Sequence, residues 1–453
     1  MKGGLQMAII KFPKDFKWGA ATASYQIEGA ANEDGRGVSI WDTFSKTPGK
    51  VHNGDTGDIA CDSYHRYEED VDLIHDLGAD VYRFSVAWPR IFPTGTGEVN
   101  QKGVDYYHKL VDSMLAKGIE PMCTLYHWDL PQVLQDKGGW DNRETIEAFV
   151  QYADFMFKEF NGKIKKWITI NEPWCSSFLS NYIGEHAPGN QDLQLATDVG
   201  HHLLVAHGLA VKRFRESNVE GEIGYAPNVT WFEPYSTKEQ DVDACNRGNA
   251  WNLEWFFDPV FKGSYPQFML DWFKEKGAVP TILNGDLEII SQPIDFLGVN
   301  YYTGNVGRYK ENEGLFDLES IDMGYDKTDI DWFIYPEGFY KVLVKIKDLY
   351  GSVPIYITEN GACYNDEPEN GKVDDHKRID YIKTHLTALK RSMDSGVNIK
   401  GFLYWSLLDN FEWALGYSMR FGIVHVNYET LERTKKDSYH WFNETIKKGE
   451  FEL

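Results

Sequence analysis

The stretch IYITENG, residues 355–361, places an acid at the end of a run of strand-forming residues. Its first four residues are β-branched or aromatic, which is typical of a buried strand. Glu359 follows them directly, ahead of a turn-forming Asn-Gly pair. The stretch KWITINEPW, residues 166–174, repeats the arrangement, with Glu172 before a proline. The two stretches predict two strands that each end in a glutamate.

Similar apolar runs alternate with amphipathic helical patterns along most of the chain. Strands are predicted at 16–22, 81–88, 120–128, 166–172, 222–228, 293–302, 353–360 and 399–408. Helical patterns lie between several of them, for example at 104–118, 143–160 and 378–393. Because strands that alternate with helices form right-handed parallel βα units, eight such units predict a closed (β/α)8 TIM barrel, an α/β fold.

The barrel would use nearly the whole chain. Length alone suits about three domains of average size, but α/β barrels often form one long unit. We therefore expect a single catalytic barrel domain over residues 1–453. Residues 303–335 show no clear periodicity, which predicts a long loop above the sixth strand. Met7 is a candidate for the natural start, which would make residues 1–6 a tag, and the alternative is an extended N-terminus.

Charge and cysteine content narrow the class of protein. With 46 basic against 69 acidic residues the net charge is −23, and no basic run offers the cationic surface that a nucleic-acid partner needs. No apolar stretch approaches the ~20 residues of a membrane span, and the N-terminus does not resemble a signal peptide. The five cysteines are scattered without a CxxC pair. This favours free thiols in a reducing cytoplasm over disulfides or a zinc site.

Both glutamates follow predicted strands, where such barrels carry their chemistry. Loops begin at the carboxyl ends of the strands, so Glu172 and Glu359 should share one rim. Two facing carboxyl groups can cleave a glycosidic bond, one as an ionised nucleophile and the other as a protonated acid. Pro173 should hold Glu172 in extended backbone. For either acid alone, the plainer alternative is a solvated loop residue or a helix cap.

Several segments together resemble one enzyme family. TINEP and YITENG look like the paired signatures of glycoside hydrolase family 1, the β-glucosidases and their relatives. FKWGAATASYQIEGA (16–30), LYHWDLPQ (125–132), GVNYYTG (298–304) and YWSLLDNFEW (404–413) match further segments of that family, in the same order. The resemblance extends from Phe12 to about Trp441. It implies a retaining β-glucosidase that needs no metal and no organic cofactor.

The resemblance also implies roles for the acids and their neighbours. Glu359 would be the nucleophile that forms a covalent glycosyl-enzyme, and Glu172 the general acid and then the general base. The carboxyl groups of a retaining pair lie about 5–5.5 Å apart. Arg83 would favour the carboxylate form of Glu359, and Tyr302 would aim its attacking oxygen. Asn300 would support Glu172.

The same resemblance implies a set of sugar-binding side chains. Donors, acceptors and rings that suit a hydroxyl-rich ligand would come from Gln26, His127, Asn171, Asn300, Tyr302, Trp405, Glu412 and Trp413. Asn171 would contact the 2-hydroxyl, and Trp405 would form a stacking floor. Trp128 and Trp174 would support the site, the latter toward the leaving group. From the residues alone, plainer alternatives stay open: a turn-capping glutamine, core tryptophans, a core histidine and a solvated loop acid.

One position separates branches of the family. Members that act on 6-phosphorylated sugars carry serine where this chain has Glu412, and a carboxylate there would repel a phosphate dianion. A 6-phospho-β-glucosidase is therefore the disfavoured alternative. Leu415 and Met419 stand where many relatives carry Glu and Lys. We interpret these two departures as affecting the outer rim of the site and not the reaction.

Rival classes have less support. His202 and His207 are five residues apart, not the four that stack two metal ligands on one helix face, and no HExxH pattern occurs. No Gly-rich phosphate loop supports a nucleotide enzyme. A catalytically silent sugar-binding barrel would have lost an acid, and both are present. We therefore expect a small-molecule β-glucoside or cello-oligosaccharide as partner, with no nucleic acid and no membrane. The sequence leaves a homo-oligomer open.

Overall fold

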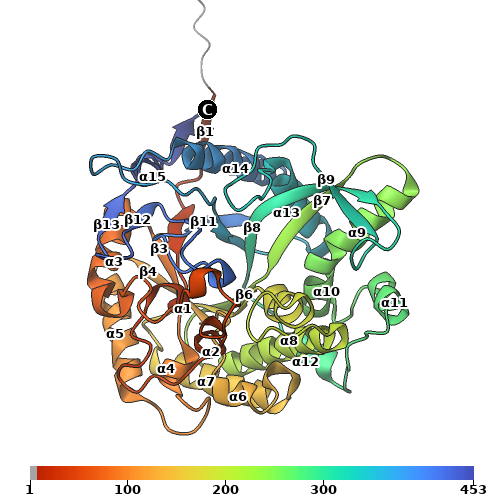
Figure 1. Ribbon diagram of the computed structural model, residues 1–453, viewed down its shortest axis with the longest axis horizontal. Coiled ribbons are helices and arrows are strands. Elements are labelled where there is room, and N and C mark those ends of the chain that lie inside the picture. Colours follow the sequence, from red (N-terminus) through yellow and green to blue (C-terminus); the bar gives the residue numbers. More distant parts are fainter. Residues whose placement is uncertain (1–7) are drawn as a thin grey trace, which may run out of the picture.

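Eight parallel strands form a closed barrel at the centre of the computed structural model, which describes residues 8–453 (Figure 1). They are β2 (Lys17–Ala21), β3 (Val81–Ser85), β4 (Glu120–Tyr126), β5 (Lys166–Asn171), β6 (Glu222–Ala226), β8 (Phe296–Tyr309), β10 (Ile355–Asn360) and β11 (Ile399–Trp405). Each pairs in parallel with the next, and β11 pairs with β2, which closes the ring. The predicted (β/α)8 TIM barrel is confirmed, strand by strand.

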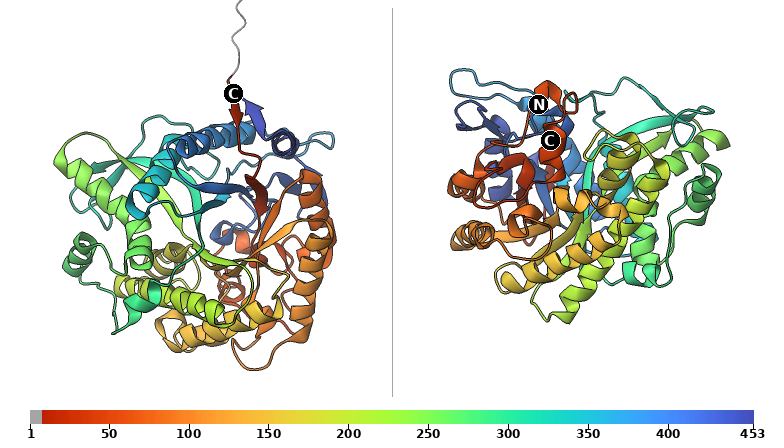
Figure 2. Two further views of the ribbon diagram at one scale, coloured as in Figure 1. Left: turned by 180° about the vertical axis from the view of Figure 1, so that it is seen from behind. Right: turned by 60° about the horizontal axis from the view of Figure 1, so that its bottom comes forward.

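Helices surround this barrel on the outside (Figure 2). The longer ones are α3 (Ser63–Leu77), α5 (Gln101–Ala116), α7 (Glu144–Glu159), α8 (Leu193–Glu216), α9 (Glu239–Asn252), α13 (Pro336–Tyr350), α14 (His376–Asp394) and α15 (Asp437–Lys448). Shorter ones are α1 (Ser24–Ile27), α2 (Ile40–Ser45), α4 (Trp88–Ile91), α6 (Gln132–Gln135), α10 (Glu254–Lys262), α11 (Gln267–Glu275) and α12 (Asp286–Ile290). The three helical patterns named from the sequence correspond to α5, α7 and α14.

The remaining elements lie outside the barrel. Two antiparallel pairs join β1 (Ile9–Lys11) to β14 (Glu450–Glu452) and β12 (Val424–Val426) to β13 (Arg433–Lys435). The first pair brings the two ends of the described chain together. Short 3₁₀ turns are η1 (His52–Gly54), η2 (Gly139–Asp141) and η4 (Trp413–Leu415), and η3 (Cys175–Ile183) is π-helical.

The long loop predicted for residues 303–335 is wrong in its first half. Strand β8 continues to Tyr309, pairing in parallel with β7 (Asn228–Pro234) and antiparallel with β9 (Leu318–Ile321). Glycines hid this extension, because Gly304 and Gly307 stand where side chains would show the alternation of a strand. They are needed for close packing: a Cβ on Gly307 would lie 2.6 Å from side-chain atoms of Cys245 and Leu318.

A layer of apolar side chains fills the inside of the barrel. Seven strands each contribute one buried residue to it, namely Val81, Met122, Ile168, Ala226, Phe296, Tyr356 and Leu403. We call these residues the inner layer. Such a layer makes the barrel a packed core and not a pore. Because each member precedes the carboxyl end of its strand or stands at it, the functional side chains lie just beyond this layer.

Two further features concern the cysteines and the apolar content of the helices. The five cysteines, at 61, 123, 175, 245 and 363, are buried free thiols in the part of the chain that the structure describes. None of the helices between residues 8 and 453 is long and apolar enough to cross a membrane. The candidate tag at residues 1–6 lies outside the described residues.

Candidate active site

A cavity of about 600 Å³ opens at the carboxyl ends of the strands. Glu172 directly follows β5, Glu359 is the penultimate residue of β10, and both line this cavity. Tyr302 on β8 and Trp405 at the end of β11 form other parts of its wall. Its volume lies in the range of small-molecule sites, about 300–1,000 Å³. The structure therefore brings the two acids to one rim and one cavity.

Charged and polar donors hold both carboxylate oxygens of Glu359. Arg83 Nη1 donates to Oε1 at 2.6 Å, and the Tyr302 hydroxyl donates to Oε2 at 2.5 Å. The same guanidinium donates to the Thr358 carbonyl and, through Nε, to the Thr124 hydroxyl. Because charge-assisted hydrogen bonds favour the ionised acceptor, this setting suits a fixed carboxylate.

Within the described residues, the side-chain donors to Glu172 are all neutral. Asn300 Nδ2 donates to Oε1 at 2.8 Å, and the Cys175 thiol donates to Oε2 at 3.1 Å. Neutral donors stabilise a carboxylate less than a guanidinium does. The sequence-based expectation that Asn300 contacts Glu172 agrees with this geometry, while Cys175 was not foreseen.

The extended backbone predicted for Glu172 is wrong. Its φ is 46°, in the left-handed region. Its N–H donates to the Ala226 carbonyl at the end of β6, and its carbonyl accepts from the Cys175 N–H at 2.9 Å, where η3 begins. The chain therefore turns from strand to helix at this residue, and Pro173 disfavours only the right-handed helical conformation. Left-handed backbone is uncommon for a non-glycine residue and clusters at functional sites.

The surroundings distinguish the two acids electrostatically. Burial, and then the charge on Glu359, raise the pKa of Glu172 to about 8. Burial also raises the pKa of Glu359, but the Arg83 guanidinium and the Tyr302 hydroxyl oppose that rise. Two close carboxyl groups do not both ionise readily. Glu172 is thus suited to hold a proton near neutral pH, and Glu359 to be the ionised member of the pair.

Asn171 connects the acids to His127. Its Oδ1 accepts from Arg83 Nη2 at 2.6 Å and from Asn300 Nδ2 at 3.0 Å, and its Nδ2 donates to His127 Nε2 at 3.1 Å. Because a carboxamide nitrogen carries two hydrogens, these contacts leave one N–H of Asn171 for a ligand. Since Nε2 accepts, a neutral His127 carries its proton on Nδ1. Burial, and then the Arg83 charge, lower the pKa of His127 well below its usual value.

Three buried atoms of the expected sugar-binding set have no hydrogen-bond partner within residues 8–453. They are Gln26 Oε1, His127 Nδ1 and Glu412 Oε2. The Gln26 amide is held by its nitrogen, which donates to Asn410 Oδ1 at 2.9 Å and to the Phe411 carbonyl at 2.8 Å. Gln26 is therefore anchored to the segment that carries Glu412. Buried polar atoms are normally paired, so these three indicate a polar ligand.

The expected tryptophans are at once core residues and parts of the cavity wall. Trp405 stacks on His127, with ring centroids 5.8 Å apart. Trp413 packs on Trp128 at 4.5 Å, and the Trp128 N–H donates to the Asn171 carbonyl at 3.1 Å. Trp174 packs against a different partner, Trp251, at 5.0 Å. All four expected rings line the cavity.

Glu412 carries less negative charge near neutral pH than its sequence position suggests. Burial, and then the charges of Glu359 and Glu172, raise the pKa of Glu412 to about 8. Near neutral pH this carboxyl is therefore largely protonated and repels a phosphate only weakly. A different feature disfavours a phosphorylated sugar: among residues 8–453, no lysine or arginine lines the cavity. A phosphate dianion in such a site would lack the cation that usually pairs with it.

The sequence did not reveal every residue of this cavity. Cys175 stands three residues after Glu172, a helical spacing that could have indicated contact. Trp332, Phe232, Trp251 and Asn228 also line the cavity. They come from β7, α9 and the irregular segment after β9. No local pattern marks such residues, because their position depends on how β7 and β9 flank the extended β8.

Comparisons with known proteins agree with this geometry. The sequence model of glycosyl hydrolase family 1 matches residues 9–451. Beta-glucosidase A of Acetivibrio thermocellus is 50% identical over 448 residues, which cover 98% of this chain and 100% of that protein. The solved family 1 β-glucosidase of Thermotoga maritima superposes with a TM-score of 0.95 at 47% identity, covering 98% of this chain and 99% of that one. The same Thermotoga enzyme in complex with deoxynojirimycin gives a TM-score of 0.94 at 47% identity, covering 97% and 99% of the two chains.

Proposed function

This chain belongs to glycosyl hydrolase family 1, and from that premise we propose that it is a retaining β-glucosidase. Its substrates are short β-linked oligosaccharides, including cello-oligosaccharides, and aryl or alkyl β-glucosides, from which it removes the terminal non-reducing glucosyl residue. Residues 1–453 act as one catalytic domain. The acidic chain with its five free thiols works in a reducing cytoplasm.

Three unpaired buried atoms of the expected sugar-binding set carry this proposal. Gln26 Oε1, His127 Nδ1 and Glu412 Oε2 offer acceptors and a donor to a polar ligand. A ligand with several hydroxyl groups can satisfy all three, because each hydroxyl both donates and accepts. The neighbouring ring of Trp405 supplies a flat surface for the apolar face of a sugar. Two facing acids then supply the chemistry of a glycosidic bond.

The first step joins the sugar to the enzyme. A carboxylate oxygen of Glu359 attacks the anomeric carbon while the bond to the leaving oxygen breaks, and Glu172 gives its proton to that oxygen. The Tyr302 hydroxyl and the Arg83 guanidinium keep the nucleophile aimed. The free N–H of Asn171 can hold the 2-hydroxyl, a contact that strengthens in the transition state.

The second step releases the sugar. Once Glu359 is esterified, its negative charge no longer raises the pKa of Glu172, which becomes more acidic and remains ionised. Glu172 then takes a proton from water, and the water oxygen displaces Glu359 from the anomeric carbon. Two inversions give a product with the configuration of the substrate.

The test is hydrolysis of 4-nitrophenyl β-D-glucoside, followed by ¹H NMR to identify the anomer formed first. We expect rapid hydrolysis with β-glucose appearing before its α-anomer, and the same rate with a chelator present. Absence of hydrolysis would support a silent sugar-binding barrel, and first formation of the α-anomer would exclude a retaining mechanism. A panel of aryl β-galactoside, aryl β-fucoside, cellobiose and a 6-phospho-β-glucoside ranks the substrates. Preference for the last would overturn the unphosphorylated assignment.

A further inference from the structure

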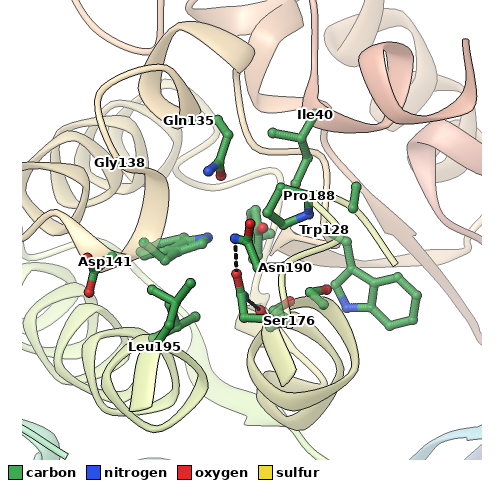
Figure 3. A pocket seen from close by; sticks show the side chains of 15 residues that line it. Ile40, Trp128, Gln135, Gly138, Asp141, Ser176, Pro188, Asn190 and Leu195 are labelled. Atoms are coloured by element: carbon green, nitrogen blue, oxygen red, sulfur yellow. Dashed lines mark hydrogen bonds between the residues drawn. The ribbon is translucent and has the colours of Figure 1, made fainter. Parts of the chain in front are cut away.

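Figure 3 shows a second cavity, seen from close by. Its volume is about 220 Å³, and it shares one wall with the active-site cavity. That wall is Trp128, which lines both. The rest comes from the start of α2, the end of β4, α6 and η2, and from η3, the segment 187–190 and the start of α8. The volume would hold about seven waters at roughly 30 Å³ each, or one small molecule. We call it the Trp128 side cavity.

Polar groups face this space without a protein partner. Ser176 Oγ and Trp140 Nε1 are buried, at 6% and 5% residue exposure, and neither has a hydrogen-bond partner in the described part of the chain. Both stand close to the Tyr126 hydroxyl, which also lines the cavity. Asn190 Nδ2 donates to Asn181 Oδ1 at 2.9 Å near the same wall. Native proteins rarely leave two neighbouring buried groups unpaired.

Apolar side chains make up part of the remaining wall. Ile40, Leu195 and Val199 line the cavity together with the ring of Trp128. A purely apolar ligand would leave the Ser176 hydroxyl and the Trp140 N–H unpaired. An anion would enter a site that no lysine or arginine among residues 8–453 lines, with the Asp141 carboxylate at the exposed rim. A neutral ring with hydroxyl edges and C–H faces matches both kinds of wall.

We propose that the Trp128 side cavity binds a small uncharged polyhydroxylated ring, such as a monosaccharide or a cyclitol, at a site separate from the catalytic one. Occupancy acts on the active site through Trp128. The N–H of that ring is bonded to the Asn171 carbonyl, and its face packs on Trp413 with centroids 4.5 Å apart. A ligand behind the ring therefore changes the position of two sugar-binding residues, and by linkage a bound substrate changes the affinity for that ligand.

Binding is tested by calorimetry with myo-inositol and with D-xylose as probes. We expect at least one probe to bind both the wild-type enzyme and Glu412→Leu. The same probe should not bind Leu195→Trp, because the larger side chain fills the cavity. The matched control is Leu209→Trp, also a half-buried leucine on α8 but outside the cavity, which should bind like the wild type. If neither probe binds, or if Leu195→Trp binds as well as Leu209→Trp, the cavity holds only water and the proposal is wrong.

A second pair of variants keeps the test valid if Leu195→Trp does not fold. Trp140→Phe and Ser176→Ala each remove one unpaired group with little change of volume, and each should weaken binding about tenfold or more. Unchanged affinity in both would overturn the proposal. This arm needs no hydrolysis, so it is independent of the proposed function.

The coupling to Trp128 is tested by initial rates on 4-nitrophenyl β-D-glucoside with the bound probe added. We expect KM to change by about fivefold, the lower end of typical coupling, and then to level off as the probe saturates. Leu195→Trp should abolish this change. A KM that rises without limit, or an equal effect in Leu195→Trp, would show simple competition at the catalytic site and contradict the coupling.

Discussion

The inner layer and the catalytic rim at the carboxyl ends of the strands lie only a few residues apart on the same strands. They bury different kinds of side chain. On β3, buried Val81 is followed two residues later by buried Arg83, and on β10 Tyr356 is followed three residues later by Glu359. The inner layer packs side chains that need little or no polar partner. The rim buries charges and amides, and leaves several polar atoms unpaired.

This difference separates the source of stability from the source of function. Burying apolar surface stabilises the fold, whereas an unpaired buried polar atom destabilises it by about 1–3 kcal/mol. The rim therefore lowers the stability that the inner layer provides, and its unpaired polar atoms can bond to a substrate. Substitutions in the rim should lose activity and keep or gain stability. Substitutions in the inner layer should do the reverse.

The largest loss is expected for Glu359→Gly. Without the nucleophile no glycosyl-enzyme forms, so kcat on 4-nitrophenyl β-D-glucoside should fall on the order of 10⁴–10⁶-fold. Transfer from α-glucosyl fluoride to an acceptor sugar should survive, because the fluoride has the configuration of the intermediate. Glu369→Gly, at an exposed position, is the control and should act like the wild type. Near-normal hydrolysis by Glu359→Gly would refute its assigned role.

A smaller loss, dependent on the leaving group, is expected for Glu172→Ala. General acid catalysis contributes about 10²–10⁴-fold, so hydrolysis of an alkyl glucoside or cellobiose should fall within that range. A 2,4-dinitrophenyl glucoside needs no proton and should react much faster than the alkyl glucoside. Azide should restore turnover and yield β-glucosyl azide, since the small anion can take the place of the lost carboxylate. An equal loss on all leaving groups would contradict the acid role.

Glu412→Leu should sharpen the contrast between the two regions. Loss of its hydrogen bonds to the sugar should lower kcat/KM by about 10- to 100-fold. The variant should nonetheless be more stable, because it removes a carboxyl whose Oε2 is unpaired in the chain from residue 8 onward. The pKa of the Glu412 carboxyl is about 4.5 in the unfolded chain, and burial raises it to about 8 in the folded chain. The gain in unfolding free energy should therefore grow as pH rises between those values.

Urea denaturation at pH 5 and pH 8 measures that gain. A Glu412→Leu protein that is less stable than the wild type at both pH values would show that the rim is not a destabilised region.

The pH dependence of the wild type should show the acid directly. Because only protonated Glu172 can donate, and burial together with the charge on Glu359 raises its pKa to about 8, kcat/KM should fall about tenfold per pH unit above that value. The thiol of Cys175 favours the ionised form of Glu172, so Cys175→Ala should move this decline to higher pH. Cys61→Ala, which removes another buried thiol, should leave it in place. A shift to lower pH in Cys175→Ala would contradict the assigned contact.

Local sequence was sufficient for some of these features and not for others. The eight barrel strands could be predicted because strands buried on both faces are nearly continuous apolar runs. The acids could be placed because each follows such a run. The extension of β8 was missed because glycine, required by close packing at Gly307, removes the alternation of a strand. The left-handed backbone of Glu172 was missed because it is set by a bond to Ala226, a residue distant in sequence. The Trp128 side cavity depends on several separate segments and has no local signal.

Phe296→Ala is expected to have the smallest effect on activity, and it tests the comparison most directly. Phe296 is 1% exposed in the inner layer, where its ring meets Tyr356 with centroids 5.5 Å apart. Truncating a buried phenylalanine destabilises by about 3–5 kcal/mol. The urea midpoint should therefore fall sharply, while kcat at 25 °C stays within about twofold for the folded fraction. Phe268→Ala, at a ring that is 49% exposed, should change neither. A large loss of kcat in Phe296→Ala with an unchanged midpoint would mean that the inner layer positions the catalytic groups, and the separation of stability from function would fail.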